Sequence, residues 1–322
     1  MYSNDVSIHR IVLNGKTYAY LRQTSGTGTI KMPGVAIDLQ GWESMGSNQI
    51  KGETDSVNAH DAVAKGEYIY LADYTGCQIG VGKVSSDGKT IINRSDLTID
   101  LQKDLAKNGK VEFDENATYY LHGEGMVIDG NDLYVLVNVN TSSAWSGYAP
   151  SYLIKYNIQN DGSLKYVDHT TMGKNTDMVK PEKFNNHVFA TAIGGYQFNG
   201  MVNEETSLDY AEIKEDGTFG INGKINLPDN VKNKESEFRG MRILPNGTAY
   251  VMRYHLDVTD DYTRMTLYKT TVSNLLAENP VDWEIVDPGG KVKGWFDGVD
   301  AEYYTKRVWL RKGNELILYV ET

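Results

Sequence analysis

One pattern recurs along the whole chain and restricts its fold more than any other feature. A short apolar strand is followed by a turn of Asn, Gly or Asp, and then by a second strand rich in Tyr and Val. Asn-Gly and Asp-Gly turns between apolar runs predict β-hairpins, because these residues tolerate the positive φ angles that tight turns require. The pattern therefore predicts a chain built from hairpins. Its instances lie at residues 9–21, 60–72, 125–137, 182–192, 241–253 and 301–311.

A second pattern follows the first. A third strand ends in a polar turn, often Asp-Gly, and a fourth strand begins. Two hairpins per unit make a four-stranded sheet, and the units repeat roughly every 45–65 residues, which is within the range of propeller blades. The second hairpins are expected at residues 78–92, 151–167, 207–221 and, with a longer connection, 265–286.

These repeats predict an all-β chain that folds as a single β-propeller domain over residues 1–322. Six blades of four antiparallel strands fit the hairpins best. The last unit stops after a third strand at 316–320, so residues 2–6 are expected to supply its fourth strand and close the ring. Seven blades stay open if residues 34–50 hold a further strand pair. A tandem of β-sandwiches would explain the strands but not their repeated order. Short helices are expected only near 100–109 and 273–279.

Charge and hydropathy exclude two classes of partner. The net charge is −11 and no basic stripe is present, whereas a nucleic-acid-binding protein needs cationic side chains to replace phosphate counterions. No apolar run has the length of a membrane span, so membrane insertion is not expected. The single cysteine, Cys77, permits no internal disulfide. That is compatible with a reduced cytoplasm and equally with exported bacterial proteins.

The entries to the predicted first strands are polar. In a propeller these strands line the central channel, and ligands commonly bind at its mouth. Histidine and carboxylate side chains gathered there could hold a divalent metal, which would polarise a carbonyl or activate water. A network of charged side chains that satisfy one another is the alternative. The channel-mouth candidates are His60, Asp61, His122, Glu124, Glu182, Arg239 and Asp300, of which His60, His122 and Glu124 are the metal candidates. No other cofactor is expected.

The segment Leu121-His122-Gly123-Glu124-Gly125 is the most distinctive of these entries. Its two glycines let the backbone pass close to a neighbouring group, and His with Glu is a possible acid–base pair. A tight entry turn that requires glycine is the competing interpretation.

Long aromatic loops are expected on the same face as the channel mouth. They lie at residues 141–150, 194–206 and 255–263. Aromatic side chains provide large contact areas at a low entropic cost, so the loops predict a surface for a small molecule, a glycan or a protein. Packing of the same rings on neighbouring blades is the alternative. The ligand-binding candidates are Trp145, Tyr148, Tyr196, Phe198 and Tyr262.

The repeated units resemble bacterial propellers of the broad lactonase-like and surface-layer-like kind. Hairpins such as IDGNDLYVLV and KGEYIYLADY carry the resemblance, together with the Asp-Gly turns at 87–88, 161–162 and 216–217. It covers nearly the whole chain but is architectural, so no catalytic residue is carried over. Two functions follow. The first is a non-catalytic binding propeller, exported to the periplasm, cell surface or medium. The alternative is a metal-assisted hydrolase or lactonase at the channel mouth.

Overall fold

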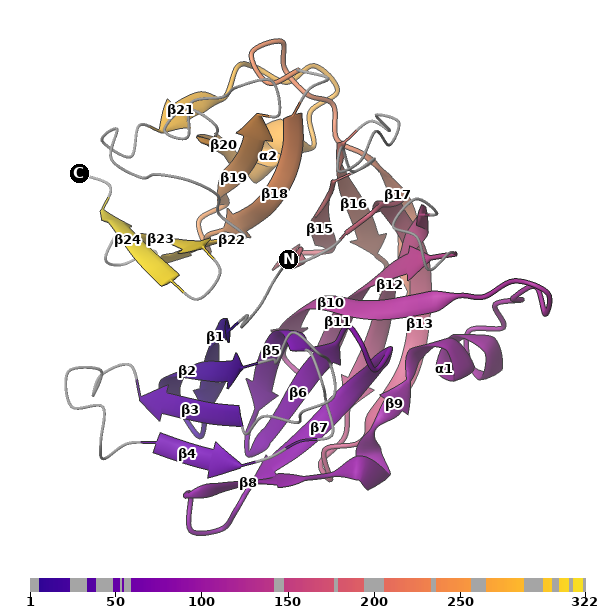
Figure 1. Cartoon of the computed structure of the whole chain (residues 1–322). Coiled ribbons are helices and arrows are strands. Elements are labelled where there is room, and N and C mark those ends of the chain that lie inside the picture. The colour runs from indigo at the N-terminus through magenta and orange to yellow at the C-terminus, as the bar shows by residue number, and fades with distance from the viewer. Residues whose placement is uncertain are drawn as a thin grey trace. The chain divides into compact units, whose positions relative to one another are not determined.

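The computed structural model describes residues 6–23, 34–38, 49–52, 54, 59–141, 148–176, 179–193, 206–232, 236–255, 265–286, 298–302, 307–312 and 315–320. These residues form an all-β fold with short helices, as the sequence predicts (Figure 1). Each predicted first hairpin is present as a pair of strands. The helices are α1 (Leu101–Lys107), α2 (Val272–Leu275) and a 3-10 turn at Ser95–Leu97, in or beside the two segments where short helices are expected.

The first part of the chain forms two sets of four strands. The strands β1 to β4 pair in chain order, and so do β5 to β8. A short parallel pairing of β4 with β8 joins the two sets into one sheet, to which β9 adds at β7. The strands are β1 (Val6–Leu13), β2 (Lys16–Gln23), β3 (Gly34–Asp38), β4 (Gln49–Gly52), β5 (Ala59–Lys65), β6 (Tyr68–Asp73), β7 (Gln78–Val84), β8 (Thr90–Asn93) and β9 (Ile99–Asp100).

Three further sheets contain four strands each, again in chain order, and the last contains three described strands. They consist of β10 (Tyr120–Asp129), β11 (Asp132–Asn140), β12 (Tyr148–Ile158) and β13 (Leu164–Lys174); β14 (Glu182–Phe184), β15 (His187–Ala192), β16 (Ser207–Ile213) and β17 (Phe219–Lys224); β18 (Ser236–Ile243), β19 (Thr248–His255), β20 (Met265–Thr271) and β21 (Glu284–Val286); and β22 (Gly298–Glu302), β23 (Arg307–Lys312) and β24 (Glu315–Val320). Several four-stranded antiparallel sheets of this kind are typical of propeller blades.

Two details of the strand prediction can be compared with the structure. Residues 34–50 contribute β3 and the first half of β4, which pair with each other and, through β3, with β2, so they belong to the first sheet. The predicted closure by residues 2–6 stays a prediction, because the described chain begins at Val6 in β1.

The turns within the first hairpins are short for a local reason. Gly66 and Gly130 join first to second strands with φ angles of 58° and 62°, which side chains other than glycine adopt at a cost. The sequence signal for the hairpins is therefore the same feature that builds them.

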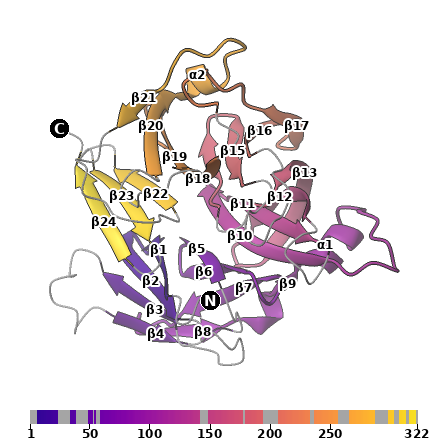
Figure 2. The same ribbon diagram turned by 45° about the horizontal axis from the view of Figure 1, so that its top comes forward.

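The chain divides into two compact units, Met1–Val137 with Ile154–Asp168 and Asn138–Leu153 with His169–Thr322. In the first unit, β1 contacts β5 and β5 contacts β10, so the first strands of successive four-strand sets are neighbours. In the second unit, β18 likewise contacts β14 and β22. Figure 2 labels β1, β5 and β10 of the first unit. The prediction of a single domain stays a prediction.

Each unit has its own apolar core between successive four-strand sets. In the first, Ile11, Leu13, Ile69 and Leu71 are buried together. In the second, the cluster contains Phe189, Phe238, Val251 and Trp283 among others. Burying one such side chain stabilises a fold by about 1.5–3 kcal/mol, so these clusters fix the sheets within each unit. Among the described residues, no helix is both long and apolar enough to cross a membrane.

Candidate functional site

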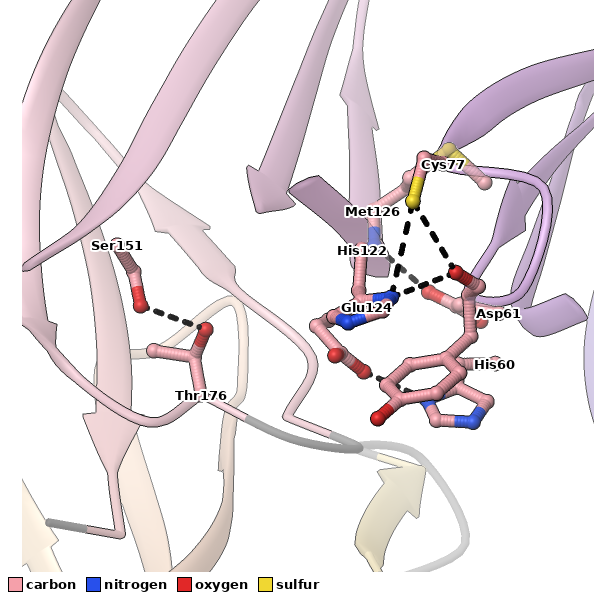
Figure 3. A network of polar contacts seen from close by, with 9 residues as sticks. His60, Asp61, Cys77, His122, Glu124, Met126, Ser151 and Thr176 are labelled. Atoms are coloured by element: carbon pink, nitrogen blue, oxygen red, sulfur yellow. Dashed lines mark hydrogen bonds and ion pairs between the residues drawn. The ribbon is translucent and has the colours of Figure 1, made fainter. Parts of the chain in front are cut away.

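The polar site of the first unit centres on a histidine–glutamate pair. The Nδ1 atom of His60 lies 2.6 Å from Oε2 of Glu124, although the two residues are 64 positions apart in the chain. They come from β5 and β10, the first strands of successive sheets (Figure 3). The Glu124 side chain is fully buried, whereas that of His60 is 12% exposed. The carboxylate is thus held inside the protein while the imidazole retains contact with solvent.

A β-bulge gives His60 its orientation. Ala59 pairs with Asp73 and Asp61 pairs with Ala72, so His60 is an additional residue on β5 with no partner position on β6. Side chains alternate between the two faces of a regular strand, and a bulge interrupts that alternation. Consequently, the consecutive residues His60 and Asp61 both interact with β10.

Asp61 links the same two strands. It is 3% exposed, and its two oxygens accept hydrogen bonds from the backbone N–H groups of Ala62, at 2.9 Å, and Met126, at 2.8 Å. Met126 lies two residues beyond Glu124 on β10. The carboxylate therefore connects β5 to the part of β10 that carries Glu124.

The four-residue turn between β6 and β7 completes the cluster. Tyr74 stacks between His60 and His122, with ring centroids 4.4 Å and 3.9 Å away. Asp73 shapes this turn, since Oδ1 accepts from the N–H of Gly76 and Oδ2 from the side chain of Gln78, both at 3.0 Å. Cys77 follows with a positive φ of 50°. Its Sγ atom lies 3.9 Å from Nδ1 of His122.

Burial controls the protonation of the inner part of the cluster. The pKa of His122 is lowered, chiefly by burial and further by the neighbouring His60. Its Nδ1 lies 2.7 Å from the carbonyl oxygen of Tyr74, so the neutral ring carries its proton on that nitrogen and donates it. Burial also raises the pKa of Cys77 to about 11. The thiol is therefore protonated at neutral pH and is a poor nucleophile.

Gly123 explains the glycine between His122 and Glu124. A Cβ atom at this position would lie 3.1 Å from the backbone nitrogen of Asp73 and 3.2 Å from backbone carbons of Ala72. The glycine therefore lets β10 pass close to the end of β6. The close approach is expected from the glycines, but the segment lies inside β10 and not in a tight turn. The acid–base role of His122 and Glu124 stays a prediction.

The structure gathers four of the predicted channel-mouth residues, His60, Asp61, His122 and Glu124, in this cluster. Glu182 lies in the second unit, where it accepts hydrogen bonds from Arg242 Nη1 at 2.7 Å and from the backbone N–H of Ile243 at 3.2 Å. Arg239 and Asp300 lie in β18 and β22, but their side chains are outside the described part of the structure. So are Trp145, Tyr196, Phe198, Tyr262 and the side chain of Tyr148.

Sequence reasoning did not place Tyr74 and Cys77 at this site. The available signal was the Asp73-Tyr74-Thr75-Gly76 sequence, an aspartate followed three residues later by glycine, which is typical of a tight turn closed by a side chain. In the described residues, no group of three or more His, Cys, Asp or Glu side chains is arranged to hold a metal ion. The predicted metal at His60, His122 and Glu124 stays a prediction.

No protein-family model and no curated protein matches the sequence. Solved structures do match. The periplasmic gluconolactonase of Pseudomonas aeruginosa is 11% identical over 98% of this chain and 81% of its own, with a TM-score of 0.56. A Bacteroides uniformis protein, provisionally assigned as a 6-phosphogluconolactonase, is 12% identical over 95% of this chain and 78% of its own, with a TM-score of 0.54. The chain resembles lactonase-like β-propellers. At such identities the likeness is one of fold, and it confirms the lactonase-like resemblance predicted from the hairpins.

Proposed function

We propose that the protein is a lactonase-type hydrolase whose general base is His60. The alternative drawn from the sequence is also a hydrolase or lactonase, but a metal-assisted one. The fold likeness supports a lactonase-type hydrolase better than the non-catalytic binding propeller. The observation that carries the proposal is the pair itself, a fully buried Glu124 bonded to the Nδ1 atom of a partly exposed His60.

The pair has the arrangement of an oriented general base. A carboxylate that accepts from Nδ1–H fixes the tautomer of the imidazole and leaves Nε2 as the basic nitrogen. In the reaction, Nε2 takes a proton from water while the water oxygen attacks the lactone carbonyl. The ring C–O bond then breaks, and the leaving alkoxide receives the proton from His60. The product is a hydroxy acid. Glu124 stabilises the imidazolium formed in between.

The experiment measures hydrolysis of glucono-1,5-lactone and 6-phosphoglucono-1,5-lactone as proton release above the uncatalysed rate. We expect His60→Gln to lower kcat/KM about 10²- to 10⁴-fold, the usual contribution of a general base. Glu124→Gln is also expected to lower kcat/KM. The matched control is His187→Gln in β15 of the second unit, which should retain activity. Equal rates for the wild type and both site variants on every lactone tested would contradict the proposal.

The same preparations test the remaining interpretations. Lactone binding without turnover, lost in Trp145→Ala and Tyr196→Ala, would favour the non-catalytic binding propeller. Stoichiometric divalent metal that is lost in Glu124→Ala would restore the metal-assisted form of the hydrolase.

We also propose that the sheets close into a six-bladed ring and that the protein is exported. The chain-order sheets and the contacts between successive first strands within each unit support the ring. Removing residues 1–8 should lower the melting temperature markedly, because it exposes strand edges. An unchanged melting temperature would contradict the closure.

The fold likeness to a periplasmic protein is the support for the proposed export of the protein, and cell fractionation tests it.

A further inference from the structure

We propose that Asp61 is the positioning residue of the His60–Glu124 pair. It would not touch substrate. Its role is to set the separation and register of β5 and β10 so that Glu124 meets Nδ1 of His60. The role in activity rests on the proposed function, whereas the role in the geometry of the pair does not.

The two oxygens of Asp61 are divided between the two strands. Oδ1 accepts from Ala62 N–H on its own strand, and Oδ2 accepts from Met126 N–H on β10. The first bond fixes the carboxylate against β5, so the second fixes β10 relative to β5. Both bonds have ordinary lengths, 2.9 Å and 2.8 Å, and the side chain is buried. Hydrogen bonds to a carboxylate are stronger than those between neutral groups.

The link acts at the position where the pair needs it. Glu124 and Met126 are separated by one residue on β10, so their side chains lie on the same face of the strand. The hydrogen bond from Met126 N–H to Asp61 therefore fixes the β10 backbone at a point two residues, or ~7 Å, from the Cα atom of Glu124. On β5, Asp61 is adjacent to His60, and the bulge at His60 directs both toward β10. One side chain thus positions both members of a pair that are distant in sequence.

An amide cannot replace this carboxylate. Asparagine has one acceptor oxygen and an NH₂ group that only donates. In Asp61→Asn, the NH₂ group must face either Ala62 N–H or Met126 N–H, and one donor loses its acceptor. The substitution keeps the volume of the side chain, so it tests the link rather than the packing.

The experiment follows the Nδ1–H resonance of His60 in long-range ¹H–¹⁵N spectra of the labelled full chain, with His60→Gln used to assign it. A short imidazole–carboxylate bond shifts this proton downfield. We expect Asp61→Asn to move or broaden the resonance, and to lower kcat about 10- to 100-fold while KM stays within about twofold, since small displacements of a base cost that much. A purely structural role would move neither quantity in protein that remains folded.

The control is Asp209→Asn in β16 of the second unit. Asp209 is also a buried aspartate, and it accepts from the Ser207 hydroxyl and from the Gly173 backbone. The Asp209→Asn variant should leave the His60 resonance and kcat unchanged. Identical effects of the two Asn variants would overturn the proposal, because they would reflect the loss of any buried carboxylate. An unchanged His60 resonance in folded Asp61→Asn would also overturn it.

Asp61→Glu provides the second test if Asp61→Asn does not fold. It retains two acceptor oxygens but places them one methylene further from the backbone. We expect a shifted His60 resonance, and an unshifted one would overturn the proposal. The two proposals fail separately. If no lactone is hydrolysed, the resonance still decides the role of Asp61. If the protein is active and the resonance does not respond, Asp61 is not the positioning residue and the proposed function stands.

Discussion

The junction of β5 with β10 and the junction of β14 with β18 join first strands of successive sheets by the same device. In each, a buried carboxylate on one strand accepts a backbone N–H of the next, Asp61 from Met126 and Glu182 from Ile243. The junctions differ in what lies beside the link. Glu182 is also paired with Arg242, whereas Asp61 adjoins a histidine that is bonded to a second carboxylate.

That difference separates a structural contact from a chemically competent one. The guanidinium of arginine is charged at every physiological pH, so the Glu182–Arg242 pair has no proton to exchange. An imidazole can gain and lose a proton near neutral pH. The junction of β5 with β10 therefore combines the strand link with a group that can act as a base.

The two regions also share a backbone irregularity. The bulge at His60 in β5 has a counterpart in β18, where Phe238 pairs with Arg253 and Gly240 with Met252, leaving Arg239 as the additional residue. Opposite the bulges, Asp73 and Arg253 are both buried. At the equivalent position opposite the bulge, the first unit thus carries an acidic side chain, Asp73, and the second unit a basic one, Arg253.

The largest effect in this comparison is expected from Arg242→Met. It removes the cation beside Glu182, which is buried, and should destabilise the fold by about 2–3 kcal/mol. Urea denaturation followed by circular dichroism measures it. The double variant Arg242→Met/Glu182→Leu should recover part of the loss. If the single variant also abolished lactone hydrolysis in folded protein, the contrast between the two junctions would be wrong.

A smaller loss is expected from Gly123→Ala. The added Cβ atom meets the backbone of Ala72 and Asp73, which cannot move as a side chain can, so we expect a cost of about 1–2 kcal/mol and reduced hydrolysis. Gly220→Ala is the control, because its Cβ atom would first meet the flexible side chain of Lys214 at 3.3 Å. Thermal melts and lactone assays on both variants provide the measurement. Equal behaviour of the two would contradict the close approach as the cause.

The pH dependence of stability should also distinguish the units. Burial lowers the pKa of His122 in the folded chain. In mild acid this side chain therefore binds a proton more readily in the unfolded chain than in the folded chain. This contribution to stability is present above the unfolded pKa, near 6.5, and is lost as the pH falls from there through the lower folded pKa. His122→Asn should flatten the decline between about pH 7 and pH 5. A decline as steep as that of the wild type would show that other groups cause it.

The smallest effect, of opposite sign, is expected at Asp209. Burial raises the pKa of this carboxyl group, so its contribution to stability is greatest at low pH and decreases as the pH rises through the folded pKa. Asp209→Asn should remove this decrease and leave the melting temperature less dependent on pH in weakly acidic buffers. A pH profile that is unchanged in shape would show that Asp209 does not titrate in this range.

Much of the secondary structure follows from the sequence. The Asn-Gly and Asp-Gly turns locate the hairpins because the φ preferences that encode them act within a few residues. The spacing of His122 and Glu124 already places both side chains on one face of a strand. The structure brings His60, Asp61, His122 and Glu124 together in one polar cluster, whereas Glu182 forms its contacts in the other unit. That these residues form a ligand site stays a prediction.

What only the tertiary structure decided is which of these side chains meet. The pairing of His60 with Glu124 depends on the packing of one sheet against the next and on a bulge that shifts β5 by one residue. The inclusion of Tyr74 and Cys77 depends on a turn that folds back onto β10. Turn propensities are local and can be read residue by residue. Contacts between sheets are set by the joint burial of distant side chains, and no spacing along the chain encodes them.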